Sequence, residues 1–198
     1  MLSITQIKQR LDNHQPQAFK LDVNRHAAVA LILRRGESGT EILLIRRAEH
    51  ENDPWSGDLA FPGGRIEEED RDDRAAAERE TWEEIGVDLS AAEYLGQGDD
   101  LGGAYLSVRV SCFIYHLHQD VPFTMNGEVV DLFWVPLTTL LDTDRNRMEE
   151  FYYRGADRTH PIVDLSEWSQ RPLWGLTYRL INNFLQLFGL SFKHPEKL

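Results

Sequence analysis

Alternation of apolar and polar positions predicts several β-strands along the chain. The predicted strands cover residues 26–34, 40–47, 105–118 and 129–135. The first contains an uninterrupted apolar run, which is typical of a strand that is covered on both faces. In the third, Cys112 shares one face with Val110 and Ile114, so this single cysteine is expected to pack in the core.

Apolar residues at helical spacing, together with helix-favouring residues, predict four helices. These helices cover residues 3–13, 72–85, 137–142 and 170–189. Three consecutive alanines, and Gly86 just past the end, indicate the second helix. Its predicted buried face contains Ala75, Thr81, Trp82 and Ile85. Before this helix, Pro54 and Gly57 predict a loop, and Pro62-Gly63-Gly64 predicts a turn.

The length of the chain and the order of these elements suit one domain with a short N-terminal extension. We expect a helix and an irregular connection over residues 1–25, followed by one domain over residues 26–198. With 41% hydrophobic and 27% charged residues, the composition is that of a soluble globular protein rather than a disordered or membrane-embedded chain.

Charge and hydropathy exclude several classes of partner. The net charge of −12 is expected to repel nucleic acid. The longest apolar run, residues 27–33, is too short to span a bilayer, and residues 1–10 lack the features of a secretory signal. A single cysteine permits no disulfide within the chain, which suits a reducing compartment. We therefore expect a cytoplasmic protein without membrane or nucleic-acid partners, and a homodimer is left open.

Negative charge is concentrated in residues 67–84, which contain ten carboxylates and three arginines. On the predicted helix, Glu80, Glu83 and Glu84 fall within an arc of about 100° and form one anionic stripe. A solvated helix face is one interpretation of such a stripe. The spacing favours another, because hard divalent cations such as Mg²⁺ prefer oxygen ligands and share them with substrate phosphates.

Residues 79–87, RETWEEIGV, resemble the core of the Nudix box, the motif of the Nudix hydrolases. The motif reads Arg-Glu, an apolar residue, any residue, Glu-Glu, any residue, Gly and an apolar residue. Gly64 resembles the glycine that opens the box, and Asp70 takes the place of its first carboxylate.

Within this family, the chain resembles the coenzyme A diphosphatase branch. The loop between Gly64 and Arg79 is one residue longer than in the general box, as in that branch. Residues 61–64 read Phe-Pro-Gly-Gly and residues 174–177 read Trp-Gly-Leu-Thr, which are also similar to that branch. Further matches are Leu43, Leu44, Arg47 and Gly57.

The resemblance implies an α/β fold, in the form of an α/β/α sandwich with a mixed central sheet, in which the box holds Mg²⁺ or Mn²⁺. The implied metal ligands are Glu80, Glu83, Glu84 and the backbone carbonyl of Gly63 or Gly64. The implied catalytic residues are Glu83, Glu128 and Arg79, where Glu128 is either a general base or a plain turn carboxylate. The expected substrate is a small nucleoside diphosphate derivative. Hydrolysis of coenzyme A at its diphosphate would yield 3′,5′-ADP and 4′-phosphopantetheine.

Three arginines that flank the predicted site, Arg46, Arg47 and Arg65, are candidates for binding phosphate. Alternation along the strand allows only one of Arg46 and Arg47 to face a cleft. Trp55 could stack on an adenine or pack over the edge of the core. The histidines His50, His116 and His118 are interpreted as structural or exposed.

Two other functions are left open by the sequence. The chain departs from the branch at two positions: Ile45 stands where threonine is usual, and Asp53 stands where an arginine is usual. The alternative substrate is therefore another nucleotide conjugate, such as a dinucleotide or a nucleotide sugar. A non-catalytic nucleotide-sensing domain is the third hypothesis. The box retains Arg79, Glu80, Glu83, Glu84 and Gly86, which favours an enzyme.

Overall fold

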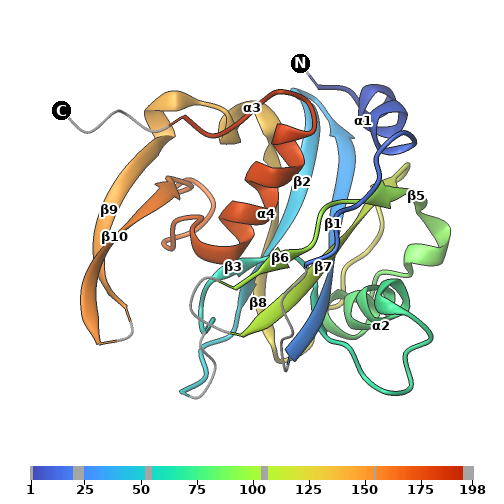
Figure 1. Cartoon of the computed structure of the whole chain (residues 1–198), viewed down its shortest axis with the longest axis horizontal. Coiled ribbons are helices and arrows are strands. Elements are labelled where there is room, and N and C mark those ends of the chain that lie inside the picture. The colour runs from blue at the N-terminus through green and yellow to red at the C-terminus, as the bar shows by residue number, and fades with distance from the viewer. Residues whose placement is uncertain (1, 20–24, 52–54, 104–106, 154, 194–198) are drawn as a thin grey trace.

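The computed structural model describes residues 2–19, 25–51, 55–103, 107–153 and 155–193. In this part of the chain, an eight-stranded sheet lies between helices (Figure 1). Its strands are β1 (Arg25–Gly36), β2 (Gly39–Arg47), β3 (Leu59–Ala60), β4 (Gly63–Arg65), β5 (Glu93–Gln97), β6 (Leu101–Gly102), β7 (Val108–Leu117) and β8 (Val129–Pro136). The order β3-β2-β1-β7-β5 forms the main path, while β4 pairs with β1, β6 with β7 and β8 with β2. Because β1 and β7 are parallel and the other pairs are antiparallel, the sheet is mixed.

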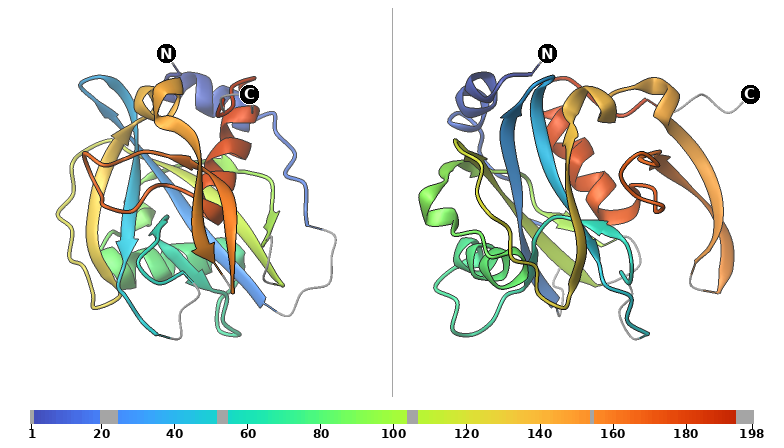
Figure 2. Two further views of the ribbon diagram at one scale, coloured as in Figure 1. Left: turned by 90° about the vertical axis from the view of Figure 1, so that its left-hand side faces the viewer. Right: turned by 180° about the vertical axis from the view of Figure 1, so that it is seen from behind.

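Helices cover both faces of this sheet (Figure 2). They are α1 (Ile4–Leu11), α2 (Asp73–Ile85), α3 (Leu137–Leu140) and α4 (Gly175–Gln186), with 3₁₀ helices η1 (Leu89–Ala91) and η2 (Thr143–Arg145). Along β1, Leu31 and Leu33 pack in a core with α1 and α4, whereas Ala30 and Ile32 pack in a second core with α2. The uninterrupted apolar run of β1 is explained by these two cores, and the predicted α/β/α sandwich is confirmed.

The predicted strands and helices are mostly confirmed, with shifts of a few residues at their ends. Gly63 and Gly64 lie in β4 rather than in a turn, and residues 105 and 106 lie outside the described residues. The alternation pattern does not predict β5, β6 or the separate two-stranded sheet of β9 (Asn146–Tyr153) and β10 (Ala156–Val163). Within the described ranges, no helix is both long and apolar enough to cross a membrane.

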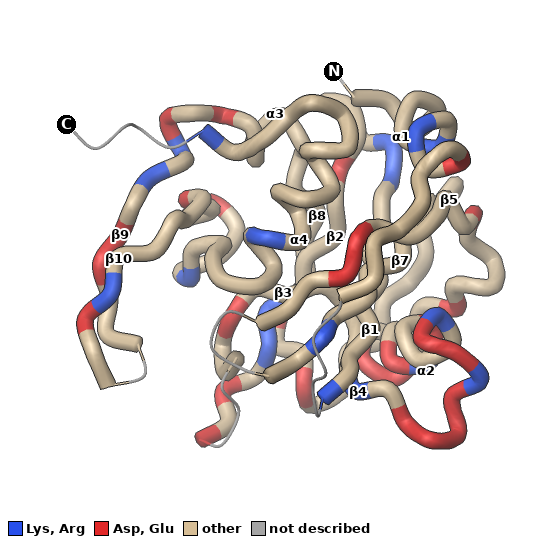
Figure 3. Tube along the Cα trace, viewed as in Figure 1, with Lys and Arg blue, Asp and Glu red and all other residues tan. Residues whose placement is uncertain are grey.

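Helix α2 begins after Asp72, whose side chain accepts a hydrogen bond from the backbone N–H of Ala75, and ends at Gly86 in the left-handed conformation. Its buried residues are Ala76, Ala77, Thr81, Glu84 and Ile85. The predicted burial of Trp82 is wrong, because 58% of this residue is exposed. The helix is instead rotated so that the Glu84 carboxylate reaches the backbone N–H of Gly63 in the buried layer. Figure 3 shows the acidic segment that precedes α2 as a loop beside the helix.

Replacing Gly63 by alanine should lower the free energy of unfolding by at least about 2 kcal/mol. Gly63 has φ of 146°, and a Cβ atom there would lie 2.3 Å from the carbonyl oxygen of Ala28 in β1. We expect a Tm about 4–8 °C below that of the wild-type protein, measured by thermal unfolding. Gly127→Ala is the matched control, because nothing lies within 4 Å of its Cβ position. Equal stability of the Gly63 variant and the wild-type protein would contradict this account of β4.

Candidate active site

Glu84 is a buried carboxylate at the contact between α2 and β4. Only 2% of the residue is exposed. Its Oε2 accepts a hydrogen bond of 2.9 Å from the backbone N–H of Gly63, and its Oε1 lies 3.6 Å from Nη1 of Arg47 at the end of β2. Burial raises the pKa of Glu84 to about 7, because the charged form loses its hydration. The negative charge of Glu84 is therefore only partly compensated by its protein neighbours.

Arg79 connects the acidic loop to the carboxylates of α2. Its Nε and Nη2 each donate a hydrogen bond of 3.0 Å to Asp70, and Nη2 also donates to the carbonyl oxygen of Arg65 at 3.1 Å. Its Nη1 donates to Glu80 at 3.0 Å and to Glu83 at 3.2 Å. The guanidinium lowers the pKa of Asp70 through these hydrogen bonds. Because a guanidinium presents several donors in a rigid plane, Arg79 can fix the loop and both glutamates together.

Glu80 lies directly against the backbone of β4. A Cβ atom on Gly64 would lie 2.5 Å from the Glu80 carboxylate, so glycine is what permits this approach. Burial raises the pKa of Glu80, Arg79 lowers it, and the charges of Glu83 and Glu128 raise it further. The side chain of Glu80 is therefore close to several negative charges on one side of α2.

Glu128 brings a fourth carboxylate to this region from the turn before β8. Its charge contributes to the raised pKa values of both Glu80 and Glu84. Its carbonyl oxygen accepts a hydrogen bond of 2.7 Å from the backbone N–H of Ala48, which ties the turn to the end of β2. The residue is exposed, so its carboxylate is accessible to solvent.

The three glutamates of α2 lie on neighbouring positions, but their oxygens do not converge on one point. Glu80 and Glu83 turn toward Arg79, whereas Glu84 turns toward Gly63. Glu80 and Glu83 share Nη1 of Arg79 as a donor, and Glu84 has a separate donor in the backbone N–H of Gly63. The donor set nevertheless fits a hard divalent cation, because it consists of oxygens and two of its carboxylates have pKa values raised by burial.

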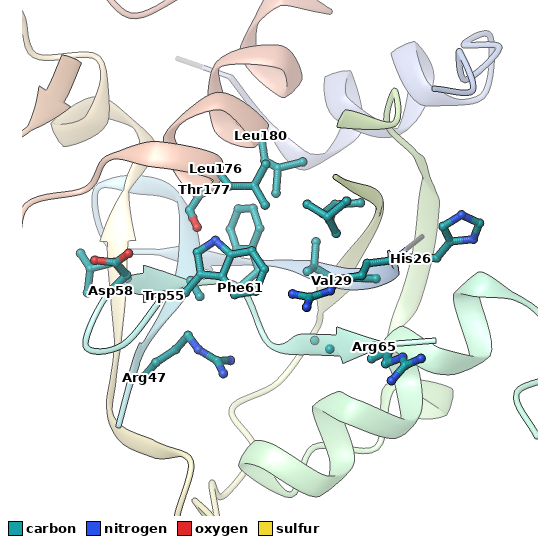
Figure 4. A pocket seen from close by; sticks show the side chains of 18 of the residues that line it. His26, Val29, Arg47, Trp55, Asp58, Phe61, Arg65, Leu176, Thr177 and Leu180 are labelled. Carbon is teal, nitrogen blue, oxygen red and sulfur yellow. The ribbon is translucent and has the colours of Figure 1, made fainter. Parts of the chain in front are cut away.

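A pocket of about 530 Å³ adjoins β4 and Arg47, which contact these carboxylates, although none of the four glutamates lines it. Its apolar wall includes Trp55, Phe61, Leu176 and Leu180, and its basic residues are Arg25, His26, Arg47 and Arg65. Figure 4 shows Trp55 and Phe61 between the α4 residues and β4, with Arg47 and Arg65 on the opposite side of the pocket from α4. Gly63 and Gly64 also line the pocket, so the strand β4 that contacts Glu80 and Glu84 forms part of its wall.

The predicted substrate-binding arginines do not all lie at this pocket. Arg47 and Arg65 line it, whereas Arg46 does not and instead lies opposite Asp131 of β8. This outcome agrees with the alternation along β2, which allows one arginine of the pair to face the pocket. Asp53, the departure from the expected arginine, lies outside the described residues.

Asp58 is a pocket residue that the sequence reasoning missed. It accepts a hydrogen bond of 2.9 Å from Nε1 of Trp174 and thereby joins the loop before β3 to the start of α4. Both residues also line an adjoining pocket of about 160 Å³. No short-range pattern indicates this contact, because the two residues are 116 positions apart.

Comparisons with known proteins agree on one family. The family model described as "NUDIX domain" matches residues 24–155. A probable nudix hydrolase of Schizosaccharomyces pombe is 30% identical to this chain over 162 residues. The match covers 81% of this chain and 55% of that protein, so the chain spans about half the length of this relative. The Nudix hydrolase NudL of Yersinia enterocolitica is 29% identical over 187 residues, which cover 93% of this chain and 92% of that protein.

Among solved structures, the MutT/nudix family protein of Enterococcus faecalis has a similar fold. The TM-score is 0.55, the sequence identity is 15%, and the match covers 94% of this chain and 74% of that chain. At this identity, the likeness concerns the fold of the chain alone.

Proposed function

The chain belongs to the Nudix hydrolase family, and from that premise we propose that it hydrolyses the diphosphate bond of coenzyme A or its derivatives with a divalent metal ion. The products would be 3′,5′-ADP and 4′-phosphopantetheine. Nudix hydrolases in general use divalent metal ions, and the preference between Mg²⁺ and Mn²⁺ is part of what the proposed experiments test.

One observation carries the choice of coenzyme A. Three sequence features that resemble the coenzyme A diphosphatase branch come from three separate segments of the chain, and residues of all three line the same pocket. Arg47 comes from the end of β2, Phe61, Gly63 and Gly64 come from the Phe-Pro-Gly-Gly segment, and Trp174 belongs to the Trp-Gly-Leu-Thr segment. Their convergence supports a shared role in recognising one substrate.

The composition of the pocket also suits this substrate. Coenzyme A combines an adenine and a long, weakly polar chain with several phosphates, so it requires an apolar wall beside cationic groups. Trp55 and Phe61 provide aromatic surface, and Arg47 and Arg65 can bind phosphate oxygens in a planar, bidentate manner. These arginines provide local positive charge in a chain whose net charge is −12.

In the proposed mechanism, Glu80, Glu83 and Glu84 would hold the metal ion together with the backbone carbonyl of Gly64. The bound ion would supply charge neutralisation and a lowered pKa for the attacking water. Arg79 is a positioning residue, because it fixes Glu80 and Glu83 through hydrogen bonds. Glu128 is the proposed general base, since its exposed carboxylate lies close enough to Glu80 and Glu84 to raise their pKa values.

Product analysis by mass spectrometry tests the proposed substrate. Purified protein is exposed in parallel to coenzyme A, a dinucleotide, a nucleotide sugar and a nucleoside triphosphate, each with Mg²⁺ or Mn²⁺. We expect the highest kcat/KM for coenzyme A, with release of 3′,5′-ADP and 4′-phosphopantetheine. If coenzyme A remains intact while another diphosphate is consumed, the assignment of coenzyme A is wrong. If no diphosphate is consumed, the chain is a non-catalytic member of the family.

A further inference from the structure

A cluster of two histidines and one glutamate lies on the sheet outside the site described above. Nδ1 of His116 and Nε2 of His118 lie 3.4 Å and 3.5 Å from the same oxygen, Oε2 of Glu93. The ligand atoms of the three residues all lie within 4.8 Å of one another. In the part of the chain that the structure describes, this is the one group of three potential metal-ligating side chains that is so compact.

The strands of the sheet produce this arrangement. Glu93 of β5 lies directly opposite His116 of β7 in the antiparallel register. His118 follows two positions later, one residue beyond the end of β7, and the centroid of its ring lies 4.3 Å from that of His116. Two members of the cluster, Glu93 and His116, are therefore anchored to backbone positions that are fixed by the hydrogen bonds of the sheet.

The cluster is remote from the proposed catalytic carboxylates. His116 lies beside Leu33 near the end of β1, whereas Gly63 pairs with Val29. It also belongs to the other face of the sheet, because Ile114, two residues earlier on β7, packs in the core with α1 and α4. The carboxylates of α2 cannot share a metal ion with this cluster.

We propose that Glu93, His116 and His118 form a second metal site, which binds one divalent transition-metal ion of the zinc type. Zinc bonds to imidazole nitrogen and carboxylate oxygen are about 2.0–2.2 Å long, so two ligand atoms in a tetrahedral site are separated by roughly 3.3–3.5 Å. The two distances from Glu93 Oε2 agree with this separation. Three protein ligands leave the fourth position to water.

The residue types separate this site from the one on α2. Imidazole favours zinc and its neighbours in the first transition series, whereas an all-oxygen set favours magnesium or manganese. The chain would therefore hold two kinds of metal ion at two places without competition. An ion at the second site would cross-link β5 to β7 and stabilise the edge of the sheet against which α1 packs.

Lys8 of α1 also contacts this cluster, through Oε1 of Glu93. The ammonium occupies one carboxylate oxygen and leaves Oε2 to face both histidines. It can orient Glu93 as an outer-sphere partner, but its positive charge opposes a second cation nearby. Replacing Lys8 by glutamine should therefore strengthen metal binding by about two- to fivefold.

The ordinary alternative is a set of ion pairs between Glu93 and protonated histidines, with no metal. Titration with Co²⁺ in excess Mg²⁺ distinguishes the two, because tetrahedral Co²⁺ absorbs visible light far more strongly than octahedral Co²⁺. Excess Mg²⁺ occupies the all-oxygen site on α2. We expect one tetrahedral Co²⁺ per chain, which Zn²⁺ displaces, and a higher Tm when either ion is bound.

Variants test whether the absorption of tetrahedral Co²⁺ comes from the cluster. His118→Ala should weaken Co²⁺ binding by at least about 10–100-fold. This variant should still fold, because 57% of the His118 side chain is accessible to solvent. His50→Ala is the matched control, since His50 is an exposed histidine outside the cluster, and it should retain the full signal. Absence of tetrahedral absorption in the wild-type protein, or its survival in His118→Ala, would overturn the proposal.

Discussion

Replacing Glu84 by glutamine should lower kcat by about 10²–10⁴-fold while the fold stays intact. Glutamine has the same shape, and its amide oxygen can still accept the hydrogen bond from the backbone N–H of Gly63. The substitution removes the negative charge that the proposed mechanism uses to hold a metal ion. It leaves the packing of α2 on β4 unchanged.

The stability of the same variant provides a separate test. In the metal-free protein, burial raises the pKa of Glu84 from 4.5 to about 7, so ionisation of this group destabilises the folded state. The cost grows as the pH rises from about 4.5 to about 7 and is complete above that range. In excess chelator at pH 8, Glu84→Gln should therefore unfold at a Tm equal to or above that of the wild-type protein.

Steady-state kinetics and thermal unfolding measure the two effects. Glu68→Gln is the matched control, because Glu68 belongs to the same acidic segment but is exposed, and its kcat should stay at the wild-type value. A Glu84→Gln variant that retains full kcat would refute the metal-ligand role. A variant that loses activity only because it unfolds would show that Glu84 is needed for the fold.

Chelation of divalent cations should reduce turnover by at least about 10²–10³-fold. Without a cation, the charges of Glu80, Glu84 and Glu128 would repel a diphosphate bound next to them, and burial increases this effect for Glu80 and Glu84. The measurement is initial rate in excess chelator, followed by addition of Mg²⁺ or Mn²⁺. Recovery of the rate on addition of either ion controls for irreversible damage. Undiminished turnover in chelator would exclude the proposed role of the carboxylates.

The sequence predicts elements well where the signal is local. Helix α2 is an example, because Asp72 and Gly86 cap it through contacts within a few residues of its ends. The rotation of α2 about its axis depends instead on a distant contact between Glu84 and Gly63, which is why the predicted burial of Trp82 is wrong. The hairpin of β9 and β10 escapes prediction because its exposed residues give β9 no regular alternation of apolar and polar positions.

The same difference between local signals and distant contacts applies to the candidate site. The carboxylates of α2 could be grouped from the sequence, because one helix fixes their relative positions. The hydrogen bond between Asp58 and Trp174 could not be predicted, since it depends on how α4 packs on the sheet. Family resemblance indicated the importance of the segment at Trp174, but only the structure shows that Leu176 and Thr177 line the pocket.

The pocket is lined by residues that lie far apart in the sequence, and this has a consequence for when it forms during synthesis of the chain on the ribosome. Its walls begin with Arg25 and end with Leu180. The central pairing of β1 with β7 also joins segments that are more than 80 residues apart in sequence, so it forms through slow, long-range contacts. A nascent chain that has not yet released α4 lacks one wall of the pocket. The complete pocket therefore forms only after α4 has emerged from the ribosome.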